Sequence, residues 1–258
     1  MNVRVGIVVP TLGNRPSYLK QSLESIQAAG TAHICLVAPK EFDCQELMNR
    51  GLVHQFLVDP GVGLAAAINM GFSKLPKEIE YINWLGDDDF LAPDSLIAAA
   101  DALDADPTAV LVYGSCEYVN PSGEMVWVNK SGQWASKILS FGPDLIPQPG
   151  ALFRRKAFEQ VGQLSNSYKW AFDFDLLLRL KKIGKLRFIN KNLASFRWHP
   201  ESLSVEYRKD SVNEASKARV SHLPQALRTV SFFWEYPVQI ATLLAGDRLT
   251  SKVNRQTN

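Results

Sequence analysis

Five short runs of apolar, mostly β-branched residues recur along the first half of the chain, at residues 3–9, 33–37, 53–58, 81–85 and 110–119. Runs of this length are typical of buried strands, and two parallel strands need a crossover between them that is usually a helix. Helical spacing does separate several runs: Leu19, Leu23 and Ile26 follow the first, and helix-like stretches at residues 64–73 and 93–103 flank the fourth. The chain is therefore predicted to have an α/β fold, with a mostly parallel central sheet flanked by helices.

Composition limits the class of protein. Hydrophobic residues make up 46% of the 258, enough to bury one principal domain. The 28 Lys and Arg residues nearly balance the 26 Asp and Glu residues, and the formal net charge of +2 gives no field that would attract nucleic acid. Cys35, Cys44 and Cys116 are widely spaced and form no CxxC pair, which indicates neither a disulfide framework nor a zinc site. We expect a protein of a reducing compartment that does not bind nucleic acid.

The ends of the chain bear on its location. The N-terminal residues lack the charged region, apolar stretch and cleavage site of a signal peptide. The apolar stretch at residues 238–245 is far shorter than the roughly 20 residues that a membrane-spanning helix needs. A cytoplasmic location is therefore predicted, with at most peripheral contact at the inner face of the membrane.

Three adjacent acids, Asp87, Asp88 and Asp89, directly follow the fourth apolar run. In an open α/β sheet the carboxyl ends of the strands face the ligand crevice, so these side chains are expected where a ligand binds. Adjacent carboxylates repel one another unless a cation or hydrogen-bond donors offset the repulsion. Such oxygen ligands suit Mg²⁺ or Mn²⁺, whose other positions are taken by water and phosphate oxygens. The pattern predicts a site for a metal and a diphosphate; the alternative is a solvated acidic turn that caps the next helix.

Two further acids, Asp173 and Asp175, begin an amphipathic stretch. Asp173 on its own would most simply be the N-cap of that helix. Its aromatic neighbours Trp170, Phe172 and Phe174 would partly desolvate the carboxylate and raise its pKa towards the range that suits a general base. The sequence therefore predicts that one acidic cluster holds metal and the other accepts a proton.

One histidine, His199, ends a strand-like run two residues after Arg197. A lone histidine is more often structural than a ligand. A neutral imidazole can nevertheless complete a metal shell, and an arginine two positions away on a strand adds positive charge on the same face.

Taken together, these segments resemble the family 2 glycosyltransferases, which are inverting enzymes with the GT-A fold, over most of residues 3–204. The resemblance rests on residues 8–19 (VVPTLGNRPSYL), on the glycine-rich stretch at 61–71 (GVGLAAAINMG), on GDDD at 86–89, on QPG at 148–150, on FDFDLLLRL at 172–180 and on the late histidine. The order and spacing of these motifs carry the resemblance.

The resemblance implies roles for particular residues. Asp173 is expected to be the catalytic base, and Asp88, with Asp89 and His199, the metal ligands for Mg²⁺ or Mn²⁺. The residues expected to bind the donor are Pro10, Thr11, Asn14, Arg15, Ala38, Gly63, Asn69, Asp87, Gln148 and Arg197, with Asp87 towards the ribose. The family usually carries acids after the second strand that contact the base, whereas this chain has Leu36 to Lys40 without one. The nucleotide base is therefore left open.

Three segments are expected. Residues 1–204 form the GT-A domain, with a nucleotide-binding half at 1–120 and an acceptor-side half at 121–204, and residues 205–258 form a C-terminal helical tail. The tail is basic, with eight Lys and Arg residues against five Asp and Glu residues. Its apolar edge, around Leu223, Phe233 and Ile240, is predicted either to lie on an anionic membrane or to pack against the catalytic domain or a second copy in a homodimer.

The predicted function is transfer of a sugar from a nucleotide-diphosphate donor to an acceptor hydroxyl of a saccharide or lipid-linked saccharide, in polysaccharide or glycolipid synthesis. A nucleotidylyltransferase is the alternative enzyme, but the loop at residues 11–15 contains one glycine rather than the glycine-rich basic loop that such enzymes use. A non-catalytic protein that binds nucleotide sugars is the alternative from another class. Retention of both Asp88 and Asp173 argues against it.

Overall fold

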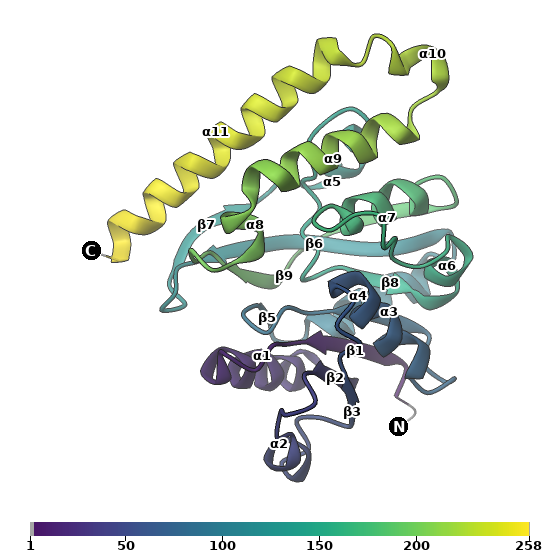
Figure 1. Cartoon of the computed structure of the whole chain (residues 1–258). Coiled ribbons are helices and arrows are strands. Elements are labelled where there is room, and N and C mark those ends of the chain that lie inside the picture. The colour runs from purple at the N-terminus through teal and green to yellow at the C-terminus, as the bar shows by residue number, and fades with distance from the viewer. Residues whose placement is uncertain (1–2, 258) are drawn as a thin grey trace.

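A nine-stranded sheet with helices on both faces forms the body of the protein in the computed structural model, which describes residues 3–257 (Figure 1). Residues 1, 2 and 258, which bound the predicted segments, lie outside the described residues. The predicted α/β fold with a helical C-terminal tail is confirmed.

The elements follow one another closely along the chain. The strands are β1 (Val5–Pro10), β2 (His33–Ala38), β3 (Gln55–Val58), β4 (Tyr81–Trp84), β5 (Phe90–Leu91), β6 (Ala109–Val119), β7 (Met125–Asn129), β8 (Leu152–Arg154) and β9 (Lys185–Arg197). The helices are α1 (Pro16–Ala29), α2 (Gln45–Asn49), α3 (Leu64–Lys74), α4 (Ser95–Ala105), α5 (Gln133–Ile138), α6 (Arg155–Gln160), α7 (Phe172–Leu180), α8 (Leu203–Glu206), α9 (Arg208–His222), α10 (Gln225–Arg228) and α11 (Phe232–Thr257).

The strand order in the sheet is β3-β2-β1-β4-β8-β6-β9-β5, with β7 paired to the outer part of β6. The first four strands are parallel, as the apolar runs predicted. The second half adds antiparallel pairs, because β8 runs against both β4 and β6 and the short β5 runs against β9. One sheet thus continues through both halves of the predicted domain.

The core lies on the two faces of this sheet. Along β1, Ile7 and Val9 face α1 and α4, whereas Val8 faces α3. This alternation follows from the period of two in a strand, and burial on both faces explains why β1 is an uninterrupted apolar run. A side chain at Gly71 of α3 would lie 2.6 Å from Val8, so only glycine lets this helix pack so closely on β1.

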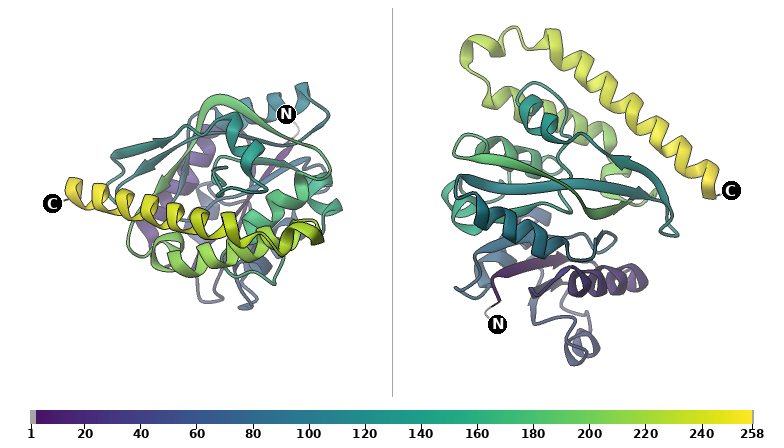
Figure 2. Two further views of the ribbon diagram at one scale, coloured as in Figure 1. Left: turned by 90° about the horizontal axis from the view of Figure 1, so that it is seen from above. Right: turned by 180° about the vertical axis from the view of Figure 1, so that it is seen from behind.

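The C-terminal helices cover one side of the body. Helix α9 packs on α7, and α11 packs on α9 and β7. Figure 2 shows α11 as a long rod along the outside of the molecule. Among residues 3–257, no helix combines the length and the apolar character needed to cross a bilayer.

Candidate active site

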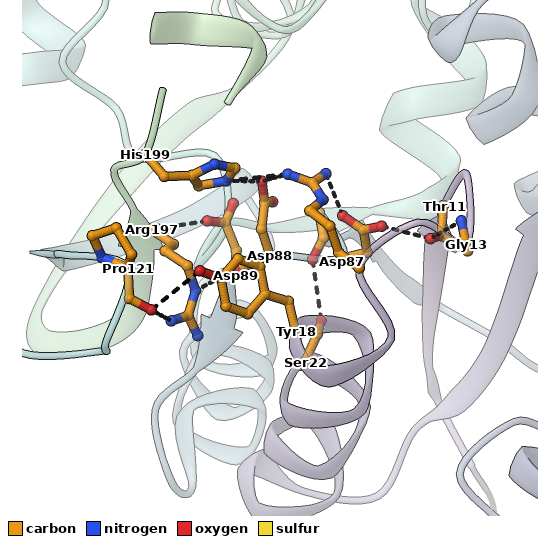
Figure 3. A network of polar contacts seen from close by, with 12 residues as sticks. Thr11, Gly13, Tyr18, Ser22, Asp87, Asp88, Asp89, Pro121, Arg197 and His199 are labelled. Atoms are coloured by element: carbon orange, nitrogen blue, oxygen red, sulfur yellow. Dashed lines mark hydrogen bonds and ion pairs between the residues drawn. The ribbon is translucent and has the colours of Figure 1, made fainter. Parts of the chain in front are cut away.

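The three consecutive acids lie in the turn that follows β4, at the carboxyl end of the parallel strands (Figure 3). Gly86 opens this turn, and its carbonyl accepts a hydrogen bond from Ser22 Oγ of α1 at 3.1 Å. A side chain at Gly86 would come within 2.7 Å of Asp88 Oδ1, so the glycine leaves room for that carboxylate.

Arg15 bridges the first two acids. Its guanidinium donates through Nη2 to Asp87 Oδ1 at 2.7 Å and through Nη1 to Asp88 Oδ2 at 2.8 Å. Asp87 also accepts from Thr11 Oγ1 at 2.5 Å. Burial raises the pKa of Asp87 in spite of these donors. The loop after β1 and the turn after β4 are therefore tied together by charge-assisted hydrogen bonds, which are stronger than those between neutral groups.

His199 completes a cluster with Asp88 and Arg15. Its Nε2 lies 2.9 Å from Asp88 Oδ2 and 3.1 Å from Arg15 Nη1, and the ring is buried. Burial alone would raise the pKa of Asp88, but the hydrogen bond from His199 and the charge of Arg15 hold it below its ordinary value. Asp88 is therefore kept ionised by its hydrogen bond with His199 and by the positive charge of Arg15.

Asp89 has different partners. Its Oδ1 accepts the backbone N–H of Arg197 at 2.9 Å, which fixes the end of β9 against the acidic turn. Burial, reinforced by the charge of Asp88, raises the pKa of Asp89 well above its ordinary value. The predicted role of Asp89 as a metal ligand stays a prediction, and the contact that the structure records for it is with β9.

Arg197 is 2% exposed, and its guanidinium contacts the backbone of the acidic turn. It donates to the carbonyls of Asp88 at 3.0 Å and Pro121 at 2.7 Å and to Gln21 Oε1 at 2.7 Å, and it stacks 4.1 Å over the ring of Tyr18. These contacts suit a positioning role, and direct binding of the donor by Arg197 stays a prediction.

Asp88 and His199 are the predicted metal ligands that the structure brings together. The described residues contain no group of three or more His, Cys, Asp or Glu side chains arranged to hold a metal ion. A divalent cation in a phosphate-transfer site usually takes one or two protein ligands and completes its shell with water and phosphate oxygens. One carboxylate and one imidazole fit that pattern, and a cation at Asp88 would compete with Arg15 for the same oxygen.

The other predicted donor-binding residues are spread around the first three strands. The Thr11 backbone N–H bonds to Val37 at the end of β2, and the Ala38 carbonyl accepts from Asp59 at 2.8 Å. Residues 36–40 at the end of β2 contain no acid, but this pairing puts Asp59, the residue after β3, beside the end of β2. A motif restricted to one strand end could not reveal an acid supplied by the neighbouring strand.

Two predicted residues use their side chains to hold other segments. The Asn69 amide exchanges two hydrogen bonds with the backbone of Leu164, at 2.9 and 3.1 Å. Gln148 donates to Asn83 Oδ1 and to the Trp84 carbonyl, so that residues 148–150 lie across the end of β4. Of the remaining predicted residues, Pro10 ends β1, Asn14 is exposed on the β1–α1 loop, and Gly63 begins α3 with a left-handed φ of 114°.

Asp173 lies in the first turn of α7. Its Oδ1 accepts the N–H of Phe174 at 2.7 Å. The preceding residue, Phe172, packs 6.2 Å from Trp84, the last residue of β4, so Asp173 and the acidic turn lie at the same end of the sheet. Burial raises the pKa of Asp173 to about 6. The second acid, Asp175, contacts Arg179 at 2.7 Å and His222 at 2.8 Å.

A third carboxyl group, Asp144, belongs to this part of the site and was not predicted from the sequence. Burial, together with the negative charge of Asp173, raises the pKa of Asp144 to about 8. Between about pH 6 and 8 the pair therefore holds one proton, with Asp173 ionised and Asp144 able to donate a hydrogen bond. Two neighbouring carboxyl groups with separated pKa values are a common arrangement for acid and base roles.

Helix α9 holds the start of α7 in place. The Glu214 carboxylate accepts the backbone N–H groups of Lys169, Trp170 and Ala171 at 3.0, 2.5 and 2.8 Å. The four leading N–H groups of a helix have no partner within it, and a carboxylate there also favours the helix dipole. Ala171 is the N-cap of α7, and Lys169 and Trp170 directly precede it, so α9 fixes the segment that leads into α7.

The open hollow of about 680 Å³ between α1 and α4 is not part of this site. It is lined by residues such as Arg4, Gln27 and Asp101, near the amino end of β1. None of the residues described above lines it.

A mixed α/β sheet with an acidic turn after β4, facing the β1–α1 loop, defines the class of GT-A glycosyltransferases, the nucleotide-diphospho-sugar transferases. The chain belongs to glycosyl transferase family 2, whose family model matches residues 6–162.

Two solved structures illustrate the shared fold. A Staphylococcus aureus TarS structure (residues 1–349, in complex with UDP) superposes with a TM-score of 0.62 at 14% identity, over 88% of this chain and 68% of that one. The mannosyltransferase PcManGT from Pyrobaculum calidifontis, in complex with GDP-Man and Mn²⁺, gives a TM-score of 0.62 at 17% identity, over 96% and 76%. At these identities the likeness concerns the fold.

Curated relatives are more similar in sequence but mostly much longer. The uncharacterized protein y4gI of Sinorhizobium fredii is 27% identical over 83% of this chain, which covers 24% of that protein. An uncharacterized glycosyltransferase of Rickettsia prowazekii is 23% identical over 76% of this chain and 64% of its own length. The chondroitin synthase of Pasteurella multocida is 25% identical over 57% of this chain and 15% of its own length. The chain thus spans less than two thirds of each of these relatives.

Proposed function

We propose that this protein is an inverting glycosyltransferase that moves a sugar from a nucleotide-diphosphate donor to an acceptor hydroxyl during synthesis of a polysaccharide or glycolipid. The observation that carries the proposal is the pairing of two acidic centres at one end of the sheet. Asp87 and Asp88 contact Arg15 and His199, and burial raises the pKa of Asp173 to about 6. Family membership and the named transferases among its relatives support the same reaction.

The reaction is a single displacement at the anomeric carbon. Asp173, ionised above about pH 6, accepts the proton of the acceptor hydroxyl as its oxygen bonds to that carbon. The bond to the diphosphate breaks on the opposite side, the nucleoside diphosphate leaves with the bonding electrons, and the configuration inverts. Arg15 contributes positive electrostatic potential where charge builds on the leaving group.

A divalent cation, Mg²⁺ or Mn²⁺, fits this proposal. Asp88 and His199 would hold it, and the chemistry that it supplies there is neutralisation of charge on the diphosphate. The mannosyltransferase neighbour was solved with GDP-Man and Mn²⁺, and TarS with UDP or UDP-GlcNAc, which supports a nucleoside diphosphate of either base as a probe. Asp59 and the Ala38 backbone, at the ends of β3 and β2, are the groups we propose for contact with the base.

The decisive experiment separates binding from turnover. Donor candidates are first found by a thermal-shift screen of nucleoside diphosphates with and without Mn²⁺, because a ligand of the native state raises its stability. We expect Asp173→Asn to keep that shift and to lose about 10²- to 10⁴-fold in turnover. Near-normal turnover of this variant would reject the base assignment.

The matched variant for the other centre is Asp88→Ala. We expect it to lose the Mn²⁺-dependent part of donor binding in calorimetry, and unchanged binding would reject the metal role. Release of nucleoside diphosphate identifies glycosyl transfer, whereas release of pyrophosphate would identify nucleotidyl transfer and overturn the proposed function.

A further inference from the structure

Helix α11 carries an apolar face that no other part of the described chain covers. Phe233, Pro237, Ile240 and Leu244 are separated by four, three and four residues, so they lie along one side of the helix. Phe233 is 70% exposed, Ile240 40% and Leu244 53%, and Tyr236 beside them is 68% exposed. An exposed apolar surface of this kind usually marks a site of protein or membrane contact.

The opposite side of α11 accounts for its attachment to the body. Glu235 is buried against Arg219 of α9, and Leu249 and Val253 pack with Val126 and Trp198. In Figures 1 and 2 the helix lies on the rim of the molecule, with its outer side turned away from the sheet. The predicted apolar edge of the tail is thus divided: Leu223 is buried, whereas Phe233 and Ile240 face outwards.

Positive charge continues the same face towards the C-terminus. Arg248 follows Leu244 by four residues and Arg255 follows Arg248 by seven, so both lie in line with the apolar residues. Lys252 does not add to this face, because its Nζ donates to the Val126 carbonyl at 2.6 Å. Asp247 is the neighbouring acid, and it forms an ion pair with Arg208 at 2.6 Å. The exposed face therefore consists of an apolar segment followed by a basic one.

A third feature extends the apolar surface beyond the helix. Phe141 is 50% exposed and its ring packs 5.9 Å from Trp234, next to Phe233. Phe141 belongs to the loop that carries Asp144, the partner of Asp173. The aromatic end of this face thus adjoins the acceptor side of the proposed active site.

We propose that the outer face of α11 lies on an anionic membrane surface, with Phe233, Tyr236, Ile240 and Leu244 in the boundary of the acyl chains and Arg248 and Arg255 against lipid headgroups. Aromatic and aliphatic residues on one face, with cations in line, match such a surface. A second copy of the chain matches it less well. Parallel contact would bring the arginines of both copies together, and antiparallel contact would put them against Phe233.

The membrane contact also bears on the acceptor. If the protein is the glycosyltransferase proposed above, the aromatic end of the docked face puts Asp144 and Asp173 close to the bilayer, which favours an acceptor carried by a lipid. This second step rests on the proposed function, whereas the docking itself does not. The experiment therefore measures membrane binding without measuring turnover.

The full chain is floated with vesicles of phosphatidylcholine alone or of phosphatidylcholine mixed with phosphatidylglycerol. We expect flotation with the anionic vesicles, weaker flotation with the neutral ones, and loss of binding as salt is raised. The double variant Ile240→Ser/Leu244→Ser should bind about tenfold or more weakly. The double variant Arg248→Gln/Arg255→Gln should lose the preference for anionic lipid.

Ile97→Ser is the matched control, because Ile97 is 51% exposed on α4, away from this face. It should float like the unsubstituted chain, and thermal unfolding of every variant checks that it is folded. No flotation of the full chain, or equal flotation of the α11 variants, overturns the proposal. So does a concentration-dependent dimer that the Ile240→Ser/Leu244→Ser variant abolishes in the absence of lipid binding.

Discussion

The charge of Asp173 disfavours the ionisation of the neighbouring carboxyl group of Asp144. Burial raises the pKa of both groups above the ordinary range. Asp173 ionises first, and its negative charge then raises the pKa of Asp144 further. Asp144 is therefore still uncharged at the pH where Asp173 loses its proton. Two predictions follow from this coupling, and both are measured as pH profiles.

The first concerns the unsubstituted protein. A base with a pKa of about 6 is protonated below that pH and cannot accept the acceptor's proton. The value of kcat/KM should therefore fall about tenfold per pH unit on the acid side of pH 6. Steady-state rates between pH 4 and 8 check this, and a profile that stays flat down to pH 4.5 would contradict the assignment.

The second concerns Asp144→Asn. Asparagine keeps the shape of the side chain and, like the protonated carboxyl group of Asp144 below about pH 8, carries no charge, so the acid limb set by Asp173 should stay near pH 6. Asp101→Asn on α4 is the control, because Asp101 lines the hollow on the other side of the sheet. An acid limb that moves to lower pH in Asp144→Asn and not in Asp101→Asn would show that Asp144 is charged while Asp173 titrates, and would contradict the order of the two pKa values.

The adjacent acids also show how the turn avoids self-repulsion. Asp87 is bound by Thr11 and Arg15, Asp88 by Arg15 and His199, and Asp89 by the N–H of Arg197. The sequence correctly indicated that three carboxylates side by side need compensating partners. It could not indicate that those partners come from two distant segments, because the loop after β1 and the end of β9 meet the turn only in the folded chain.

At the scale of single elements, α7 depends on α9 for its first turn. Glu214→Ala removes the acceptor for three backbone N–H groups and should lower the free energy of unfolding by about 1–3 kcal/mol. Asp173 would be held less firmly, so kcat should fall while the donor KM changes little. Denaturant unfolding and steady-state kinetics measure the two effects.

Two comparisons distinguish positioning from general destabilisation. Glu214→Gln keeps the acceptor oxygen but removes a charge that raises the pKa of Asp173, so it should shift the acid limb of the pH profile to lower pH. Glu46→Ala on the exposed α2 should change neither kinetics nor stability. If Glu214→Ala and Glu46→Ala have the same kcat, the positioning role is refuted.

Elements with a strong local signal were predictable, and elements defined by their partners were not. The apolar runs predicted β1 to β4 and β6, because strands buried on both faces need apolar residues at nearly every position. The two-residue β5 and the three-residue β8 carry too few residues to show a pattern, and they exist because β9, β4 and β6 pair with them. The pairing of Asp144 with Asp173 was missed for the same reason.

On the scale of the whole molecule, a buried ion pair between two helices of the tail is also bonded to the body through its arginine. Arg219 of α9 donates to Glu235 of α11 at 2.7 Å, with side chains 2% and 6% exposed, and also to the Gly142 carbonyl at 2.6 Å, two residues before Asp144. The guanidinium lies 5.4 Å over the ring of Phe174, next to Asp173. One arginine therefore connects α11, α9, the Asp144 loop and α7.

Loss of that connection should be costly. Glu235→Ala leaves Arg219 buried without its charged partner, and we expect a loss of about 3–5 kcal/mol in the free energy of unfolding. The control is Asp247→Ala, which breaks the exposed pair with Arg208 and should cost less than about 1 kcal/mol. Equal decreases in the free energy of unfolding of the two variants, measured by urea denaturation, would show that the buried pair contributes no more to stability than the exposed pair.

The connection through Arg219 also has a consequence for how the protein is made. Ribosomes release a polypeptide from its N-terminus, and the nascent sheet can begin to assemble as soon as β1 to β4 emerge. The segment around Asp173 then waits for Glu214, Arg219 and Glu235, which are translated 41, 46 and 62 positions later by their numbering. A ribosome paused between those points would carry the strands of the first half while the segment around Asp173, the base proposed above, still lacked these three partners, so this segment would be completed late in synthesis.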